Sequence, residues 1–362
     1  MKWFFKKVFL LTAIVCLAAC DNGVDDLLPP ADEYVAQPRY LVAHNGKVYV
    51  TFYDGNVARI DTASLEIEAV AKVGRNPEQL AVYNGSLYVA NSGGMDYSAS
   101  LGYDKTVSVV DVETFTEVKK IDVVCNPAVV VASENGVYVA SYGNYYDIPS
   151  TLQFVNADGD VSVVEKCSKM TEVCYNSGVL YGFFSQYDEN WNATITYMSY
   201  NPVTGAVETP WIKEQELPSP YKVSSAGNYV CVTSSDYIND GDVYFYDTHG
   251  ALVKKFAAGL NPVKAVAVQN VPLNGKEVFY VLNSGDWKSN NSSLTMYDFA
   301  NGTVKQNYFE LQNGRCLGNT ANDIVVYGSK MYIAVSGEST IEVTTLDAKS
   351  IKQIEHVVRV GK

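Results

Sequence analysis

The sequence is poor in the side chains that catalysis and nucleic-acid binding most often require. It holds only 3 histidines in 362 residues, and its 27 Lys and Arg are outnumbered by 40 Asp and Glu. Its seven cysteines form no Cys-x-x-Cys pair. An acidic chain repels phosphate backbones, which argues against nucleic acid as a partner. The cysteine spacing removes a common sequence sign of a structural zinc site.

Long hydrophobic runs are absent except at the N-terminus. Three lysines there precede the apolar residues 8–15, and the small-residue sequence Leu-Ala-Ala-Cys ends at Cys20. This pattern resembles a bacterial lipobox, so residues 1–19 are predicted to be a signal peptide and Cys20 the lipidated N-terminus. The apolar run is too short to span a bilayer as a helix. We therefore expect attachment to the membrane through a lipid anchor.

The segment that follows the predicted lipid anchor has no periodic pattern. Residues 20–37 are polar and contain Pro29-Pro30, which predicts a flexible tether. Removal of residues 1–19 leaves 24 Lys and Arg against 40 Asp and Glu, a net charge of −16 for the mature chain. The acidic character is therefore stronger in the mature protein than in the precursor.

Five cysteines remain beyond Cys20, namely Cys125, Cys167, Cys174, Cys231 and Cys316. Their odd number and isolated positions favour small, buried, hydrophobic side chains. A disulfide between Cys167 and Cys174 stays open, because spacing alone cannot establish a pairing.

A unit of roughly 40–50 residues recurs along the rest of the chain. A proline, often in an Asn-Pro step, precedes most units, at Pro38, Pro77, Pro127, Pro220 and Pro262. Each step leads into an apolar strand, a glycine turn and a second strand, as in LVAHNGKVYV at 41–50 and LAVYNGSLYV at 80–89. Alternating apolar and polar residues around Asn-Gly steps predict antiparallel hairpins.

A third and a fourth strand complete each unit. The third strands are expected at 57–61, 107–112, 152–155, 196–200, 243–247, 294–298 and 341–347. Seven units of four strands, with no sustained helical period, predict an all-β fold: a seven-bladed β-propeller of four-stranded antiparallel blades over residues 38–362. A barrel or a sandwich would not explain seven repeats at this spacing. The second unit, with LYVAN at 87–91 and SVVDVETF at 108–115, resembles YVTN-type propeller repeats.

The predicted loops divide between two unlike faces of the propeller. The strands of a blade alternate in direction from the axis outward, so the second-to-third links share a face with the links between blades. Five of these second-to-third links are long, at 92–105, 141–150, 185–192, 234–242 and 284–293. The turns on the opposite face are mostly tight, as at Asn45-Gly46 and Asn84-Gly85. Long loops on a rigid scaffold are the usual place for binding.

The long loops are rich in aromatic residues interleaved with Asn, Ser, Gly and Asp. Aromatic rings give a large contact area at low entropy cost, and amides and hydroxyls add adaptable hydrogen bonds. The predicted ligand-binding residues are Tyr97, Tyr103, Tyr142, Tyr145, Tyr146, Tyr187, Trp191, Tyr237 and Trp287, together with Asn291 in the last long loop.

Catalysis has little support in this pattern. The histidines His44, His249 and His356 fall outside the long loops, which argues against a zinc site or a histidine base there. The loop carboxylates Asp96, Asp104, Asp147, Asp188, Asp236, Asp240 and Asp286 could act as acid–base pairs or bind calcium. The spacing of Asp236, Asp240 and Asp242 does not fit an EF-hand, so solvated acidic loops are the favoured interpretation. We predict a protein that is not an enzyme and that needs no metal or cofactor.

One stretch carries a more specific resemblance. The sequence NSGDWKSNNSSLTMYD at 283–298, followed by residues 313–343, resembles propeller lipoproteins of Bacteroides-type outer membranes. The matching positions are Asn283, Gly285, Asn291, Ser293, Leu294, Tyr297 and Asp298. One branch of that group binds cobalamin at the cell surface and caps a TonB-dependent vitamin B12 transporter. In those relatives this blade opens the propeller, whereas here it is the sixth unit.

The resemblance implies a lipid-anchored outer-membrane protein that faces the cell exterior. It also implies a small ligand, with a corrinoid as the candidate, which the long-loop face would bind and pass to a TonB-dependent transporter. Two alternatives remain open: a protein- or glycan-binding adhesion module, and a hydrolase of the propeller lactonase kind.

Overall fold

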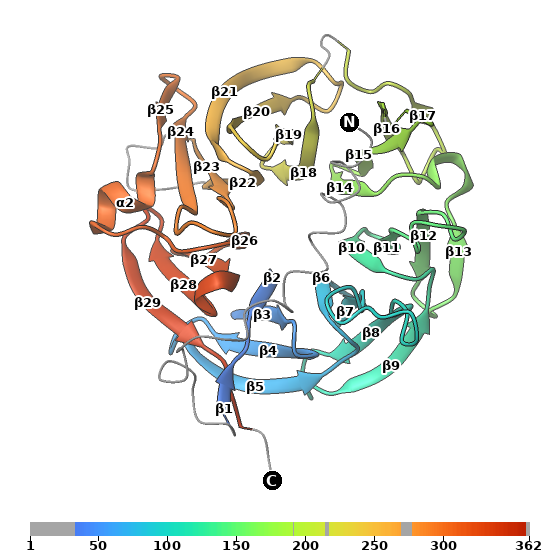
Figure 1. Ribbon diagram of the computed structural model, residues 1–362, viewed down its shortest axis with the longest axis horizontal. Coiled ribbons are helices and arrows are strands. Elements are labelled where there is room, and N and C mark those ends of the chain that lie inside the picture. Colours follow the sequence, from blue (N-terminus) through green and yellow to red (C-terminus); the bar gives the residue numbers. More distant parts are fainter. Residues whose placement is uncertain (1–32, 191, 214–216, 269–276, 360–362) are drawn as a thin grey trace.

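The computed structural model describes residues 33–190, 192–213, 217–268 and 277–359. The predicted signal peptide, Cys20, residues 20–32 of the predicted tether and Trp191 lie outside these ranges. The described residues form an all-β structure with seven four-stranded antiparallel sheets arranged around an axis (Figure 1). The predicted seven-bladed β-propeller is confirmed.

Each blade is built from four strands that are consecutive in the sequence. Blade 1 contains β2 (Pro38–His44), β3 (Lys47–Phe52), β4 (Asn56–Asp61) and β5 (Glu66–Lys72), and blade 2 contains β6 (Pro77–Tyr83), β7 (Ser86–Asn91), β8 (Thr106–Asp111) and β9 (Glu117–Asp122). Blade 3 contains β10 (Pro127–Ala132), β11 (Gly136–Ser141), β12 (Thr151–Asn156) and β13 (Val161–Val163), and blade 4 contains β14 (Glu172–Asn176), β15 (Val179–Tyr187), β16 (Ala193–Tyr200) and β17 (Val207–Glu208). Blade 5 contains β18 (Pro220–Ala226), β19 (Tyr229–Ser234), β20 (Asp240–Tyr246) and β21 (Leu252–Leu260). Blade 6 contains β22 (Pro262–Val268), β23 (Val278–Asn283), β24 (Ser293–Asp298) and β25 (Thr303–Lys305), and blade 7 contains β26 (Ala321–Tyr327), β27 (Lys330–Val335), β28 (Thr340–Thr345) and β29 (Ser350–Glu355).

Burial follows the position of a strand within its blade. All six residues of β11 and of β23 are buried, because the neighbouring blades cover both faces of these second strands. The outer strand β9 is exposed except at Ile121, and Figure 1 shows β9 at the perimeter. The core is therefore divided into layers between adjacent blades. Between blades 5 and 6, for example, the buried rings of Phe245 and Phe279 meet edge to face at 4.9 Å.

The turns between third and fourth strands share one polar device. In six blades an Asp or Asn at the end of the third strand accepts a hydrogen bond from the backbone N–H two residues on, at 2.9–3.1 Å. These residues are Asp61, Asp111, Asn156, Asn201, Asp247 and Asp298. Side chains of this kind favour tight turns because they satisfy backbone donors locally. In blade 7, Thr345 accepts instead from the Lys349 N–H at 3.2 Å.

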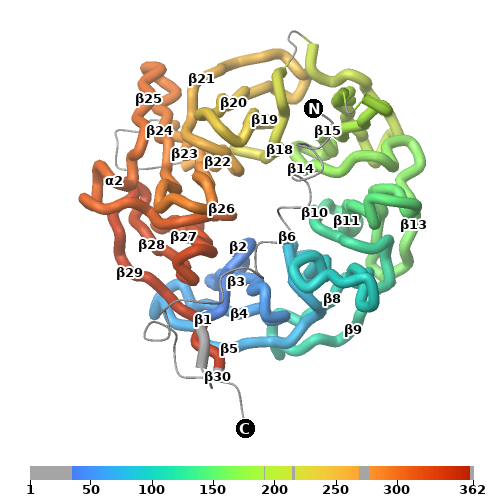
Figure 2. The backbone as a smooth tube through the Cα atoms, in the orientation of Figure 1, coloured from blue at the N-terminus to red at the C-terminus, as the bar shows by residue number. Residues whose placement is uncertain are grey.

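The ring closes between blades 7 and 1. The short strands β1 (Glu33–Val35) and β30 (Val357–Arg359) pair antiparallel, and Figure 2 shows them beside each other at the rim. The Ala36 N–H donates to the His356 carbonyl at 2.9 Å, and the Leu41 N–H donates to the Asp323 carboxylate at 2.8 Å. Residues 33–35, which the sequence placed in the tether, thus belong to the closure of the propeller.

The links between blades contain short helices, namely α2 (Tyr308–Asn313) and the 3-10 turn η2 (Glu165–Cys167). The 3-10 turn η3 (Ser336–Glu338) lies in the short second-to-third link of blade 7. The long link of blade 4 is shorter than predicted. Strands β15 and β16 continue their pairing as far as Tyr187 and Ala193, which leaves only residues 188–192 outside the strands.

Candidate functional site

The links between second and third strands share a face with the links between blades, and we call this the long-loop face. Its long loops are residues 92–105, 142–150, 188–192, 235–239 and 284–292. The asparagines of the Asn-Pro steps hold two of these loops. Asn76 accepts hydrogen bonds from the N–H groups of Met95 and Asp96 at 3.1 and 3.2 Å, and Asn261 donates to the Gly285 carbonyl at 2.9 Å. The asparagine of a repeated Asn-Pro step therefore holds a long loop in place, although the loops themselves differ in sequence from blade to blade.

Most of the predicted aromatic residues on this face are exposed. Six of the eight that the structure describes expose 48–93% of their area: Tyr97, Tyr145, Tyr146, Tyr187, Tyr237 and Trp287. Tyr103 and Tyr142 are half-buried. An exposed set of large rings confined to one face is unusual for a soluble surface and marks a candidate interaction site.

Two groups of rings form on this face. In the first, Tyr97 stacks on Tyr103 with ring centroids 4.4 Å apart, and Tyr103 meets Tyr145 edge to face at 6.1 Å. These residues come from the long loops of blades 2 and 3. In the second, Tyr237 from blade 5 meets Tyr221 edge to face at 5.4 Å. Tyr221 belongs to the innermost strand of its blade, so the second group extends toward the axis.

Three ion pairs lie between the innermost strands of the propeller, where those strands begin. Lys222 and Glu172 are 2.7 Å apart, Arg39 and Glu78 are 2.8 Å apart, and Lys264 and Asp323 are 2.7 Å apart. These strands surround the axis (Figure 1). We call the six residues the axial cluster: Arg39, Glu78, Glu172, Lys222, Lys264 and Asp323. It contains three cations and three anions and carries no net charge.

The axial cluster is linked to the loop aromatics through Tyr142. The Tyr142 hydroxyl donates to Glu172 Oε1 at 2.8 Å, the same oxygen that receives the Lys222 ammonium. Burial, and then the negative charge of Glu172, raises the pKa of Tyr142 well above its usual value. Burial acts to lower the pKa of Lys222, but Glu172 and the surrounding tyrosines outweigh it, and the pKa is raised. Both groups therefore stay protonated at neutral pH, as hydrogen-bond donors.

Further tyrosines line the same region. Burial raises the pKa of Tyr40 to about 12 and acts in the same direction on Tyr53, while the Arg39 guanidinium opposes both shifts. Arg39 lies over the Tyr53 ring at 4.3 Å from its centroid. The candidate site thus has a charged, tyrosine-rich centre within a wider set of exposed rings.

Other predicted residues take different roles. Asn291 accepts from the Asp286 N–H at 2.9 Å and donates to the Asp286 carboxylate at 3.3 Å, so its amide is engaged within its own loop. Trp287 lies under the Lys288 ammonium, 4.9 Å from the ring centroid, and its carbonyl accepts from Asn319. Tyr146 is the most exposed of the rings. Trp191 lies outside the described residues.

The sequence pattern predicted Tyr142 but not the axial cluster, nor the neighbouring Tyr40, Tyr53 and Tyr221. Arg39 and Glu78 each follow the proline that starts an innermost strand, and Lys222 lies two residues after Pro220. Charged residues thus recur within two positions of the prolines that start the innermost strands, and this recurrence could have indicated the cluster. The alternating strand pattern alone does not show which side chains face the axis.

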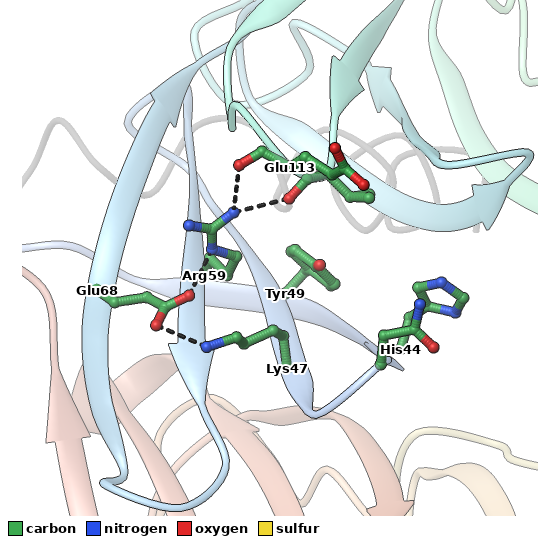
Figure 3. Close-up of a pocket in the computed structure, with 8 residues that line it drawn as sticks. His44, Lys47, Tyr49, Arg59, Glu68 and Glu113 are labelled. Carbon is green, nitrogen blue, oxygen red and sulfur yellow. Dashed lines mark hydrogen bonds and ion pairs between the residues drawn. The ribbon is translucent and has the colours of Figure 1, made fainter.

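The opposite face, which we call the turn face, carries a pocket of about 480 Å³ between blades 1 and 2. Figure 3 shows Arg59 and Lys47 both directed toward Glu68, and their nitrogens lie 2.6 and 2.7 Å from its carboxylate. Arg59 also donates to the carbonyls of Val112 and Glu113. The exposed rings Tyr97, Tyr145, Tyr146, Tyr187, Tyr237 and Trp287 all belong to the opposite side, so we place the candidate site on the long-loop face.

Two of the cysteines and one of the histidines are engaged in packing. Cys167 and Cys174 are buried free thiols, so the disulfide that their spacing left open is not formed, and burial raises the pKa of each to about 12. Burial lowers the pKa of His356, whose ring lies 4.8 Å from that of Phe52. Within the described ranges, no three His, Cys, Asp or Glu side chains gather as metal ligands could. None of the helices in those ranges is long and apolar enough to cross a membrane.

The comparisons with known proteins support the architecture. No protein-family model matches this chain, and no curated protein matches it. Among solved structures it is similar to the computationally designed protein Ika8, with 11% identity, a TM-score of 0.53, and coverage of 91% of this chain and 89% of that chain. Hydrazine synthase of Kuenenia stuttgartiensis is similar over 90% of this chain and 81% of that chain, with 14% identity and a TM-score of 0.44. The likeness to Ika8 shows the fold alone, and the protein belongs to the structural class of seven-bladed β-propellers.

Proposed function

We propose that this chain is an outer-membrane surface lipoprotein that captures a small ligand on its long-loop face and passes it to a TonB-dependent transporter. The observation that carries the proposal is the concentration of exposed tyrosines around the axial cluster. Rings such as Tyr145 and Tyr237 offer apolar contact area. Beside them, the Lys222 ammonium has N–H groups beyond the one that faces Glu172, and the Tyr142 oxygen, whose O–H is donated to Glu172, can still accept a hydrogen bond.

A corrinoid such as vitamin B12 is the ligand that we propose. Its broad ring suits an array of aromatic faces, and its amide side chains suit the donors and acceptors between them. The resemblance of residues 283–298 to surface cobalamin-binding lipoproteins supports the same choice. The raised pKa values of Tyr142 and Lys222 argue against these two groups as activated nucleophiles. The activity that we propose is therefore binding without turnover.

Calorimetric titration with cyanocobalamin tests the ligand. We expect a dissociation constant in the micromolar range or tighter, and a loss of at least tenfold when Tyr97, Tyr145 and Tyr237 are together replaced by serine. The control is Tyr83→Ser, which changes a tyrosine at the turn-face end of β6 and is expected to bind like the wild type. Absence of binding by any corrinoid at micromolar concentration would exclude this ligand.

The proposed anchor and transporter are tested in the full-length chain. Cys20→Ala is expected to abolish labelling by radioactive palmitate and to release the protein from the membrane fraction. A TonB-dependent receptor is expected to co-purify with the lipidated protein. If Cys20→Ala is still labelled by palmitate and still found in the membrane fraction, the lipoprotein assignment is wrong.

A protein partner is the second candidate function, and one observation favours it. Exposed aliphatic side chains accompany the tyrosines on the long loops, at Met95, Leu101, Ile148 and Ile238. Exposed apolar side chains on one face of a protein are typical of protein interfaces. In that case a partner protein would be recovered by pull-down, replacement of Leu101 and Ile238 by serine would abolish its recovery, and small molecules would leave the melting temperature unchanged.

A further inference from the structure

The long-loop face contains two tyrosines whose backbone conformation is unfavourable for their side chains. Tyr145 has a φ of 59° and Tyr237 a φ of 63°, in the left-handed region that bulky residues rarely adopt. The described residues include two further bulky side chains at such angles, Leu65 at 58° and Phe115 at 52°. The cost of this conformation must be offset by something at each position.

Burial offsets the cost at the turn face but not at the long-loop face. Leu65 and Phe115 are only 7% and 5% exposed, and each fills the core beneath a turn between third and fourth strands. Tyr145 and Tyr237 are 70% and 67% exposed. Each ring makes one edge-to-face contact, Tyr145 with Tyr103 and Tyr237 with Tyr221, and most of its remaining area faces solvent. The unbound chain therefore gains less from large rings at these two positions than at Leu65 and Phe115, and glycine or asparagine would serve the backbone better.

Each of the two tyrosines is held by the polar residue immediately before it. The Asn144 side chain accepts hydrogen bonds from the N–H groups of Tyr146, Asp147 and Ile148 at 2.9–3.0 Å. The Asp236 carboxylate accepts from the N–H groups of Ile238 and Asn239 at 2.9 and 2.7 Å. The same local device therefore recurs in the loops of blades 3 and 5, and it presents a tyrosine each time.

The two tyrosines flank blade 4, whose innermost strand begins with Glu172. The Lys222 ammonium, paired with Glu172, acts electrostatically on the phenols of both Tyr145 and Tyr237. The loop of Tyr145 also holds Tyr142, whose hydroxyl donates to Glu172, and the Tyr237 ring contacts Tyr221, the neighbour of Lys222. The Lys222–Glu172 pair therefore connects the two loops. Two exposed rings beside paired charges and a hydroxyl suit a ring-shaped molecule.

We infer that Tyr145 and Tyr237 form an aromatic clamp for an uncharged, ring-shaped ligand that carries amide or hydroxyl groups. This inference rests on the proposed function and names the two positions that carry the contact. The ligand is uncharged because every cation of the axial cluster already faces an anion, as Lys222 faces Glu172 and Arg39 faces Glu78. A ligand with a net charge would have to compete with one of these pairs.

Glycine substitutions at Tyr145 and Tyr237 test whether the two rings bind ligand or stabilise the fold. Tyr145→Gly and Tyr237→Gly remove the ring and relieve the backbone, so we expect the melting temperature to hold or rise while affinity falls at least tenfold. Tyr145→Ala is expected to lose the same affinity and to melt below Tyr145→Gly. The matched control is Phe115→Gly, which relieves the same conformation at a buried ring and is expected to melt lower and to bind like the wild type.

The probes separate the ligand chemistries. Cyanocobalamin contains one broad ring and N-acetylchitohexaose a linear chain of sugar rings, and both are neutral and rich in amides. Their charged counterparts are the hydrolysed corrin carboxylate and the deacetylated amine oligomer. We expect one neutral probe to bind, and its charged counterpart to bind at least tenfold more weakly. Equal or tighter binding of the charged form would overturn the assignment of an uncharged ligand.

The outcomes also distinguish this inference from the proposed function. If the wild type binds a neutral probe and both glycine variants bind it equally well, the clamp is wrong and capture on this face stands. If the wild type binds neither neutral probe, both the clamp and the capture of such a ligand are overturned. A melting temperature that falls in both glycine variants would show that the tyrosines serve the fold.

Discussion

Both faces of this propeller have turns that an Asp or Asn side chain closes and that hold a large residue at positive φ, but the burial of that residue differs between the faces. On the turn face, Asp or Asn side chains close the turns between third and fourth strands, and the large residue at positive φ, as at Phe115, is buried. On the long-loop face, Asn144 and Asp236 close comparable turns, yet the residues at positive φ, Tyr145 and Tyr237, face solvent. Burial in the core thus offsets the backbone strain on the turn face, whereas on the long-loop face each tyrosine has a single edge-to-face ring contact and is mostly exposed. The clamp that we propose would give these exposed tyrosines a role that packing does not.

The largest expected effect contrasts a buried ring of the turn face with an exposed ring of the long-loop face. Phe115 packs against Tyr49 with centroids 5.9 Å apart and lies under the Arg59 guanidinium. Phe115→Ala should lower the free energy of unfolding by about 3 kcal/mol, because it removes a buried ring and leaves a cavity. Tyr146→Ala, at a ring that is 93% exposed, should change it by less than about 0.5 kcal/mol.

Urea unfolding followed by circular dichroism measures both variants. If Phe115→Ala and Tyr146→Ala lower the free energy of unfolding by similar amounts, the contrast between the two faces is wrong. The exposed ring of the long-loop face would then contribute as much packing energy as the buried ring of the turn face. The Tyr146 variant serves as the matched control for aromatic truncation at the surface.

The second test concerns the ion pairs of the axial cluster. These residues belong to the innermost strands, which are part of the scaffold, and they also contact the candidate site through Tyr142. Lys222 and Glu172 are 24% and 13% exposed. Lys222→Met leaves the Glu172 carboxylate without its cation and should cost about 2 kcal/mol, a value reduced by the remaining solvent screening. Lys222→Met combined with Glu172→Gln should recover most of that loss, since no unpaired charge remains.

Thermal and urea unfolding of the single and double variants measure this coupling. A loss below about 0.5 kcal/mol in the single variant would show that water already screens the pair. The arginine variant Lys222→Arg keeps the charge and is expected to stay near the wild type in stability.

The regularity of the repeat explains how much of the molecule could be predicted from the sequence. Hairpins with Asn-Gly turns, such as residues 41–50, and the alternation of β8 are local patterns, so the blades and their number followed from them. The pairing of β1 with β30 could not be predicted, because each strand has three residues and they are far apart in the sequence. The extension of β15 to Tyr187 was hidden because its last residues are polar and exposed.

The candidate site was predictable in composition but not in geometry. Loop length and aromatic content identified Tyr145 and Tyr237 as candidates. Their positive φ values depend on how Asn144 and Asp236 close their loops, and no sequence pattern specifies that in advance. The pairing of Lys222 with Glu172 joins residues 50 positions apart on different blades. The packing of blade 5 against blade 4 brings these two side chains together.

The smallest expected effect is the pH dependence of the stability that Asp236 contributes to the long loop of blade 5. Hydrogen bonds from the backbone and the side chain of Asn239 lower the pKa of Asp236 to about 2, from an ordinary value near 3.8. Because the folded-state pKa is depressed, the contribution of this carboxylate is present above pH 3.8 and is lost as the pH falls through about 2. The difference in melting temperature between the wild type and Asp236→Ala should therefore be constant from pH 7 to 4 and shrink between pH 4 and 2. Carboxyl NMR titration of Asp236 gives the pKa directly, and an ordinary value would show that the loop does not hold Tyr237 through this residue.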